Sequence, residues 1–268
     1  SSTKINHSLL EGSNVSFVGT ATIGDDHVDK LYLQSQGIEF SSAAGSSTES
    51  VVEYMLASFF HLEQQGKLSF TDDTLGIIGV GRIGSLLDSA CQKLGFKTQH
   101  NDPPRQRDEG DEGFYDLNHL LENADILTLH TPLNIDGEFP TTHLIGEKEL
   151  KKFKGKGIIN AGRGQCLDNQ ALLNWLNENE DRFAVLDCWQ AEPNISLKLL
   201  NHPQLLIASP HIAGHSLDGK AANTYFVYKD LCALLQVNPT WKTETDLPAI
   251  DSTSLKPNLL KSELSEYL

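Results

Sequence analysis

Short apolar runs alternate with helix-like segments through the middle of this chain, and this alternation constrains its fold more than any other feature. Predicted strands cover 74–80, 97–101, 125–130, 156–161, 183–189 and 205–209, and predicted helices between them cover 82–94, 116–123, 147–153 and 168–178. Parallel strands need helix-sized crossovers that pack on the faces of their sheet. The sequence therefore predicts an α/β fold with a doubly wound parallel sheet.

Two longer helix-like segments flank this region, at 51–65 and 218–236. A chain of 268 residues with 39% hydrophobic residues is long for one domain and can bury a sizeable core. We therefore expect two domains, joined by these two helices. From 237 onward the sequence loses clear periodicity, which indicates a peripheral or incomplete element.

Charge and cysteine usage narrow the classes of function. The formal net charge of −15 argues against a nucleic-acid or membrane partner. The sequence shows neither an apolar run of bilayer length nor a secretory pattern in its first twenty residues, so a cytoplasmic protein is expected. The cysteines and histidines show neither disulfide nor zinc spacing, so no metal is expected; the cysteines are Cys91, Cys166, Cys188 and Cys232.

The segment LGIIGVGRIGS contains three glycines, Gly79, Gly81 and Gly84, which follow a predicted strand and open a predicted helix. In a dinucleotide-binding turn such glycines permit a tight turn, close approach of the pyrophosphate and close helix packing. Asp102 lies eighteen residues after Gly84, where a carboxylate accepts hydrogen bonds from ribose hydroxyls and repels a 2′-phosphate. These features together predict an NAD site, whereas the glycines alone could form an ordinary turn. Arg105, three residues further on, leaves the preference for NAD over NADP open.

Three polar residues follow the later predicted strands: Arg163, Glu192 and His211. The carboxyl ends of parallel strands line one crevice, so these side chains could meet although they lie far apart in sequence. An imidazole suits proton transfer near neutral pH, and a guanidinium can bind a carboxylate through two hydrogen bonds. Each residue could also have an ordinary structural role.

The chain resembles the D-isomer-specific 2-hydroxyacid dehydrogenases, and within them the branch that oxidises 4-phospho-D-erythronate in vitamin B6 synthesis. The matching segments are 19–29, 51–54, 102–105, 130–144 and 211–220. The resemblance implies NAD-dependent oxidation of this phosphorylated 2-hydroxy acid to 2-oxo-3-hydroxy-4-phosphobutanoate. In this interpretation His211 is the general base, Glu192 orients it, and Arg163 binds the substrate carboxylate.

The resemblance also implies binding residues and an assembly. Cofactor contacts are expected at Gly79, Gly81, Arg82, Ile83, Gly84, Asp102, Thr131, Asp187 and Gly214, and substrate contacts at Ser1, Thr22 and His215. Thr22 and Thr131 could instead bond only to backbone groups. His215 stands where this branch usually has a tyrosine. A homodimer is expected for the full-length protein.

The same resemblance suggests how the chain is divided. Residues 1–50 are expected to form the C-terminal part of a substrate domain, 51–211 an NAD-binding domain, 212–236 a return to the substrate domain, and 237–268 the start of a truncated dimerisation region. The chain is thus expected to be an internal fragment. Two alternatives stay open: a related enzyme such as a phosphoglycerate dehydrogenase, and a non-catalytic NAD-binding protein like the corepressors of this fold.

Overall fold

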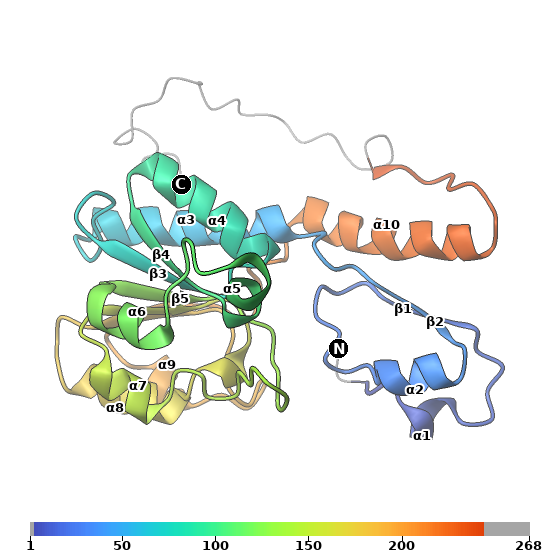
Figure 1. Ribbon diagram of the computed structural model, residues 1–268, viewed down its shortest axis with the longest axis horizontal. Coiled ribbons are helices and arrows are strands. Elements are labelled where there is room, and N and C mark those ends of the chain that lie inside the picture. Colours follow the sequence, from blue (N-terminus) through green and yellow to red (C-terminus); the bar gives the residue numbers. More distant parts are fainter. Residues whose placement is uncertain (1–2, 244–268) are drawn as a thin grey trace. The chain divides into compact units, whose positions relative to one another are not determined.

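The computed structural model describes residues 3–243, which separate into two compact units (Figure 1). The smaller unit contains residues 3–50 and 214–243, and the larger unit contains residues 51–213. Among the described helices, none combines the length and the apolar character needed to cross a membrane.

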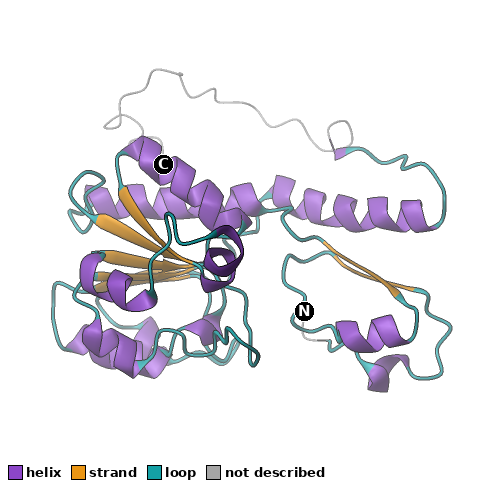
Figure 2. Ribbon diagram, in the orientation of Figure 1, coloured by secondary structure: helices purple, strands orange, loops and turns teal. Residues whose placement is uncertain are grey.

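The larger unit is built on a six-stranded parallel sheet, seen edge-on between its helices in Figure 2. Its strands are β3 (Thr74–Ile78), β4 (Lys97–Asn101), β5 (Ile126–Leu129), β6 (Gly157–Asn160), β7 (Phe183–Leu186) and β8 (Leu205–Ala208). Their order is β4-β3-β5-β6-β7-β8, and every neighbouring pair is parallel. The prediction of an α/β fold with a doubly wound parallel sheet is confirmed.

Alternate residues of the strands supply two hydrophobic cores, as expected where side chains point to opposite faces. Ile158 belongs to one core and Ile159 to the other. The first core includes residues of α6 (Leu117–Asn123), α7 (Glu147–Lys152), α8 (Asn169–Asn177) and α9 (Leu197–Leu200). The second includes residues of α3 (Thr48–Gln64) and α4 (Arg82–Leu94). Helices therefore cover both faces of the sheet.

The smaller unit pairs β1 (Phe17–Thr20) with β2 (Glu39–Ser42) in a parallel two-stranded sheet. Its helices are α1 (His7–Leu10), α2 (Lys30–Ser35) and α10 (Leu217–Leu234). Helix α10 packs closely on β1. Only a glycine at position 19 permits this packing, because a Cβ there would lie 2.3 Å from Val227 Cγ1. Residues far apart in sequence thus form one unit.

The structure also contains a helix that the sequence analysis did not predict, α5 (Pro103–Glu109). Asp102 caps this helix by accepting a hydrogen bond from the Arg105 amide, and proline occupies its first turn. Aspartate followed by proline is a recognisable start of a helix. Helix α3 begins three residues earlier than predicted, at Thr48 rather than at 51.

Candidate active site and cofactor site

The candidate cofactor site lies at β3, where the direction in which the chain adds strands to the sheet reverses. From β3 the chain moves outward to β4 and then crosses back to β5 on the other side of β3. Ligands of open parallel sheets bind in the crevice at the carboxyl ends of such strands. The glycine loop follows β3 and Thr131 follows β5, so both border this crevice.

The three glycines of the loop have different surroundings. Gly79 has a φ of +87°, and a Cβ there would lie 2.9 Å from the backbone of His130 and Thr131. A Cβ on Gly84 would lie 2.2 Å from the carbonyl oxygen of Gly79, so α4 can approach the loop only without that side chain. At Gly81 no atom of the described chain lies within 4 Å of the added Cβ. This open face is where a pyrophosphate could approach the backbone.

Two buried polar atoms after β5 also fit a ligand in this crevice. The Thr131 hydroxyl and the His130 Nδ1 are buried and make no hydrogen bond within residues 3–243. The predicted cofactor contact at Thr131 therefore has a hydroxyl available for a ligand, and the alternative of a backbone bond is not seen within that range. Burial lowers the pKa of His130 to about 4, so this imidazole is neutral at physiological pH. The residues present fit an NAD site.

Asp102, which is expected to bind the adenosine ribose, also accepts hydrogen bonds from two backbone amides. One carboxylate oxygen accepts the Val80 amide of the glycine loop at 2.8 Å, and the other accepts the Arg105 amide at 3.1 Å. A carboxylate has about four acceptor positions, so the side chain can still accept hydrogen bonds from ribose hydroxyls. Its contact with NAD stays a prediction, as do those of Arg82 and Ile83, the first two residues of α4.

The predicted acid and base meet in the larger unit. Glu192 follows β7, His211 follows β8, and the His211 Nδ1 lies 2.9 Å from the Glu192 Oε2. The other carboxylate oxygen of Glu192 accepts the Trp189 amide. His211 has a φ of +57°, a conformation that is uncommon outside glycine and often found at functional sites. Its side chain is 46% exposed, so the imidazole remains accessible.

The electrostatics of the pair favour a charged carboxylate and a basic imidazole. The hydrogen bond with Glu192 raises the pKa of His211, although burial works in the opposite direction. Burial alone would raise the pKa of Glu192, but hydrogen bonds from His211 and Trp189 and the charges of His211 and Arg163 outweigh it. The pKa of Glu192 is therefore lowered, and this residue accepts hydrogen bonds as a carboxylate.

Arg163 lies in the loop after β6, beside the loop that carries Glu192. A Cβ on Gly164 would lie 1.9 Å from the Trp189 carbonyl oxygen, so the two loops are in direct backbone contact there. The Arg163 carbonyl accepts a hydrogen bond from the Asn160 side chain at 3.0 Å, and its guanidinium donates to Gly162. The charge of Arg163 acts on both Glu192 and His211. The predicted catalytic residues thus occupy neighbouring loops.

A residue whose structural role the sequence did not indicate, Asp187, anchors the loop of His211. Its buried carboxylate accepts hydrogen bonds from the amides of Ile212 and Ala213, at 2.7 and 2.9 Å, and from the Ser209 hydroxyl. Its backbone carbonyl accepts the His211 amide at 2.8 Å. Asp187 therefore positions the base, and its expected contact with NAD stays a prediction.

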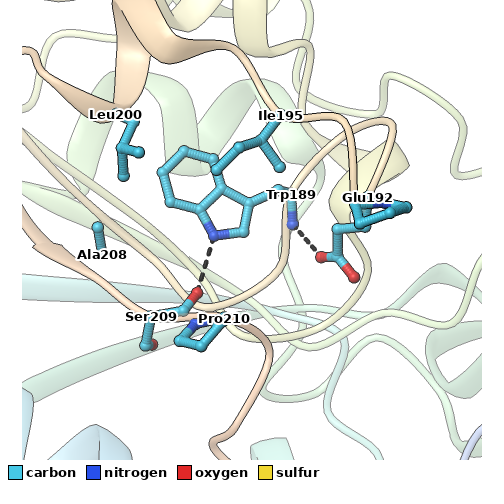
Figure 3. Close-up of a pocket in the computed structure, with 8 residues that line it drawn as sticks. Trp189, Glu192, Ile195, Leu200, Ala208, Ser209 and Pro210 are labelled. Atoms are coloured by element: carbon cyan, nitrogen blue, oxygen red, sulfur yellow. Dashed lines mark hydrogen bonds between the residues drawn. The ribbon is translucent and has the colours of Figure 1, made fainter.

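A cavity of about 340 Å³ lies behind Glu192 (Figure 3). Its lining is mostly apolar and includes Trp189, Ile195, Leu200 and Pro210. The Trp189 indole donates a hydrogen bond to the Ser209 carbonyl at 2.8 Å. The Trp189 indole thus links the loop that carries Glu192 to the segment just before His211.

Among residues 3–243, one group of three potential metal ligands lies close together, namely Cys188, Glu192 and His211, whose ligand atoms are within 4.8 Å of one another. The Cys188 thiol donates to the Gly162 carbonyl at 3.2 Å, and burial raises its pKa. Glu192 and His211 bind each other, so a metal would have to displace their hydrogen bond. The atoms that could ligate a metal are thus already used in hydrogen bonds.

Of the predicted substrate residues, Thr22 and His215 belong to the smaller unit. Ser1 lies outside the described residues. The Thr22 hydroxyl bonds to the Gly24 carbonyl at 2.8 Å and to the Thr20 hydroxyl at 2.6 Å, which is the local role considered for it. His215 is exposed, and Gly214 is the first residue of the unit's second segment. Their contacts with ligands stay predictions.

Comparison with known proteins identifies the family. Residues 50–213 match the NAD-binding domain of the D-isomer-specific 2-hydroxyacid dehydrogenases. Erythronate-4-phosphate dehydrogenase of Proteus mirabilis is 43% identical over 99% of this chain, which covers 71% of that protein. The Escherichia coli O127:H6 enzyme of the same name is 45% identical over 93% of the chain, which covers 66% of that enzyme.

A solved structure supports the fold. D-lactate dehydrogenase from Aquifex aeolicus, complexed with NAD and lactic acid, matches with a TM-score of 0.72 at 23% identity, over 87% of this chain and 80% of that one. The expected family and its NAD-binding domain are confirmed by these matches. The chain belongs to the family of D-isomer-specific 2-hydroxyacid dehydrogenases.

Proposed function

We propose that this chain carries the catalytic residues for oxidation of 4-phospho-D-erythronate to 2-oxo-3-hydroxy-4-phosphobutanoate. The observation that carries the proposal is the Glu192–His211 hydrogen bond of 2.9 Å, formed beside the Arg163 loop in the unit that also has the glycine loop. The two relatives match almost the whole chain, and their name, erythronate-4-phosphate dehydrogenase, supports the choice of 4-phospho-D-erythronate as the substrate.

His211 acts as the base through a defined nitrogen. Ionised Glu192 can only accept hydrogen bonds, so the His211 Nδ1 bonded to it carries a hydrogen. The neutral imidazole then has its lone pair on Nε2, which accepts the proton of the substrate C2 hydroxyl as the carbonyl forms. NAD held at the glycine loop would supply the acceptor for the hydride that leaves C2. Glu192 stabilises the resulting imidazolium and keeps the ring oriented.

Arg163 binds the substrate carboxylate and polarises the C2 oxygen. Its planar guanidinium can make two parallel hydrogen bonds to a carboxylate, which a lysine ammonium cannot reproduce. The loop hydrogen bonds between Asn160 and Arg163, and between Gly162 and Asn160, hold its backbone in place. The Arg163 guanidinium and the His211 imidazole are thereby presented to adjacent groups of one substrate, its carboxylate and its C2 hydroxyl.

The test is NADH formation from NAD and 4-phospho-D-erythronate, with 3-phospho-D-glycerate as the competing substrate. It uses this chain and a chimera extended by the flanking regions of the Proteus mirabilis relative, of which this chain covers 71%. We expect preference for phosphoerythronate, with kcat reduced about 10²-fold or more in His211→Asn. Arg163→Lys should raise KM and also lower kcat, because Arg163 both binds the carboxylate and polarises the C2 oxygen. His61→Asn, a change at an exposed histidine of α3, serves as the matched control.

Three outcomes would count against this proposal. Preference for phosphoglycerate would indicate another member of the family, and NAD binding without turnover of either substrate in the chimera would indicate a non-catalytic binding protein. An equal loss of activity in His61→Asn would show that the effect of His211→Asn is not specific to the base.

The assembly and location form part of the same proposal. We infer a homodimer in the cytoplasm, on the basis of the family resemblance. Light scattering coupled to gel filtration of the chimera, compared with this chain, tests the dimer through its mass.

A further inference from the structure

Arg105 is a cation beside the glycine loop, in addition to Arg82 within it, and each of its three guanidinium nitrogens is directed at a partner. Its Nη1 donates to the Val80 carbonyl at 2.5 Å and lies 3.2 Å from the Ser85 hydroxyl. Its Nε and Nη2 donate to the two carboxylate oxygens of Glu109, at 2.7 and 2.6 Å. The guanidinium also lies 5.3 Å from the centre of the Phe114 ring. The side chain is thus held in one position.

This position is next to the acid that is expected to read the adenosine ribose. The Val80 amide donates to Asp102 while the Val80 carbonyl accepts from Arg105, so both side chains are hydrogen-bonded to one residue of the glycine loop. In dinucleotide-binding folds an acid here binds the ribose hydroxyls of NAD, whereas a nearby arginine can accommodate the 2′-phosphate of NADP. Asp102 and Arg105 therefore favour opposite cofactors.

Glu109 changes the balance between them. It lies four residues after Arg105 on α5 and occupies the Nε and Nη2 edge of the guanidinium, the planar fork that would otherwise bind two oxygens of a phosphate. It also adds a negative charge, so Asp102, Arg105 and Glu109 together carry a net charge of about −1, which disfavours a phosphate dianion. The Arg105 and Glu109 side chains are 36% and 50% exposed, so a ligand in solution can compete for the fork.

We propose that Glu109 is a cofactor-specificity residue that withholds Arg105 from the 2′-phosphate of NADP. The preference for NAD then depends on two carboxylates, Asp102 at the ribose and Glu109 on the arginine. Neither a local glycine pattern nor Asp102 by itself would account for a preference for NAD over NADP, because Arg105 is close to both.

The test measures dissociation constants of NAD and NADP by titration calorimetry, on the whole chain and without substrate, so its result is independent of the proposed reaction. In Glu109→Gln, which keeps the side-chain length and removes the charge, we expect the ratio of the NADP to the NAD dissociation constant to fall about tenfold. The double variant Glu109→Gln with Arg105→Ala should lose this gain. Glu112→Gln, an exposed acid just beyond α5, should leave the ratio unchanged.

Each contrary result overturns the proposal. An unchanged ratio in Glu109→Gln, or equal weakening of both cofactors, would show that Glu109 does not govern the choice. A gain that persists without Arg105, or one that Glu112→Gln reproduces, would reduce the effect to general charge repulsion. Circular-dichroism melting of each variant confirms that the compared chains are folded.

Discussion

At the residue scale, the charge state of His211 determines when the site can accept a proton. Its hydrogen bond with Glu192 raises the pKa of His211, so the imidazole stays protonated to higher pH than an ordinary histidine, whose pKa is about 6.5. A protonated imidazole cannot act as a base. The rate of oxidation should therefore fall as the pH drops through the raised pKa and be fully developed above it.

Removing the charge of Glu192 tests this assignment. In Glu192→Gln the pKa of His211 should fall, so the acid limb of the kcat/KM profile should move to lower pH while kcat decreases about 10²-fold. The measurement is the pH profile of NADH formation in wild type, in Glu192→Gln and in Glu112→Gln. An acid limb that stays in place in Glu192→Gln would mean that another group controls it.

Asp187 is expected to affect the stability of the His211 loop. In Asp187→Asn an amide NH₂ replaces one acceptor oxygen and faces donors, so the free energy of unfolding should decrease by about 2–3 kcal/mol. Ser209→Ala removes one donor of the same network and should cost only about 1 kcal/mol. Denaturant unfolding of both variants checks the order. Equal stability of Asp187→Asn and wild type would contradict the anchoring role.

At the element scale, the glycines of the turn between β3 and α4 have two different roles. Gly79 and Gly84 are needed for folding, whereas Gly81 is available for binding. Gly84→Ala would place a Cβ 2.2 Å from a carbonyl oxygen, and Gly79→Ala combines a φ of +87° with backbone contacts of 2.9 Å. Both variants should therefore melt at clearly lower temperature. Gly81 has a φ of −74° and open space, so Gly81→Ala should keep its melting temperature.

The Gly81→Ala variant also tests the cofactor site. The methyl group of Gly81→Ala lies on the open face of the turn, so NAD affinity should decrease about tenfold or more although the fold is retained. Thermal melting and NAD titration calorimetry separate the two effects. Gly81→Ala with unchanged NAD affinity would place the pyrophosphate elsewhere.

At the scale of the whole molecule, the larger unit has its own two-sided core and its own glycine loop. A chain of residues 48–213, which keeps α3 whole, should unfold cooperatively and bind NAD without oxidising substrate. Calorimetric melting and NAD titration check this expectation. A chain that fails to melt cooperatively would show that the larger unit depends on the rest of the protein.

The smaller unit has a different sequence basis, because its two segments, 3–50 and 214–243, come from opposite parts of the chain. We propose that it forms part of a substrate domain, in keeping with the expected division at 50 and near 212. The expected dimerisation region at 237–268 lies largely outside the described residues.

Much of the larger unit could be predicted because its elements are determined locally. The predicted segments 82–94 and 97–101 coincide with α4 and β4, since an amphipathic helix and a strand each depend on the order of neighbouring side chains. Helix α5 was missed, although Asp102 before two prolines is a capping signal that could have revealed it. The short elements of the smaller unit were not predicted.

The sequence by itself determined the alternation of elements, and hence the parallel sheet and the crevice at its carboxyl ends, because side-chain periodicity and crossover length are local properties. The tertiary structure alone decided which distant groups meet: Glu192 with His211, Asp187 with the loop of the base, and Arg105 with the Val80 carbonyl of the glycine loop. Such pairings depend on strand order and on close backbone contacts. Those features arise only when segments separated in sequence pack against one another.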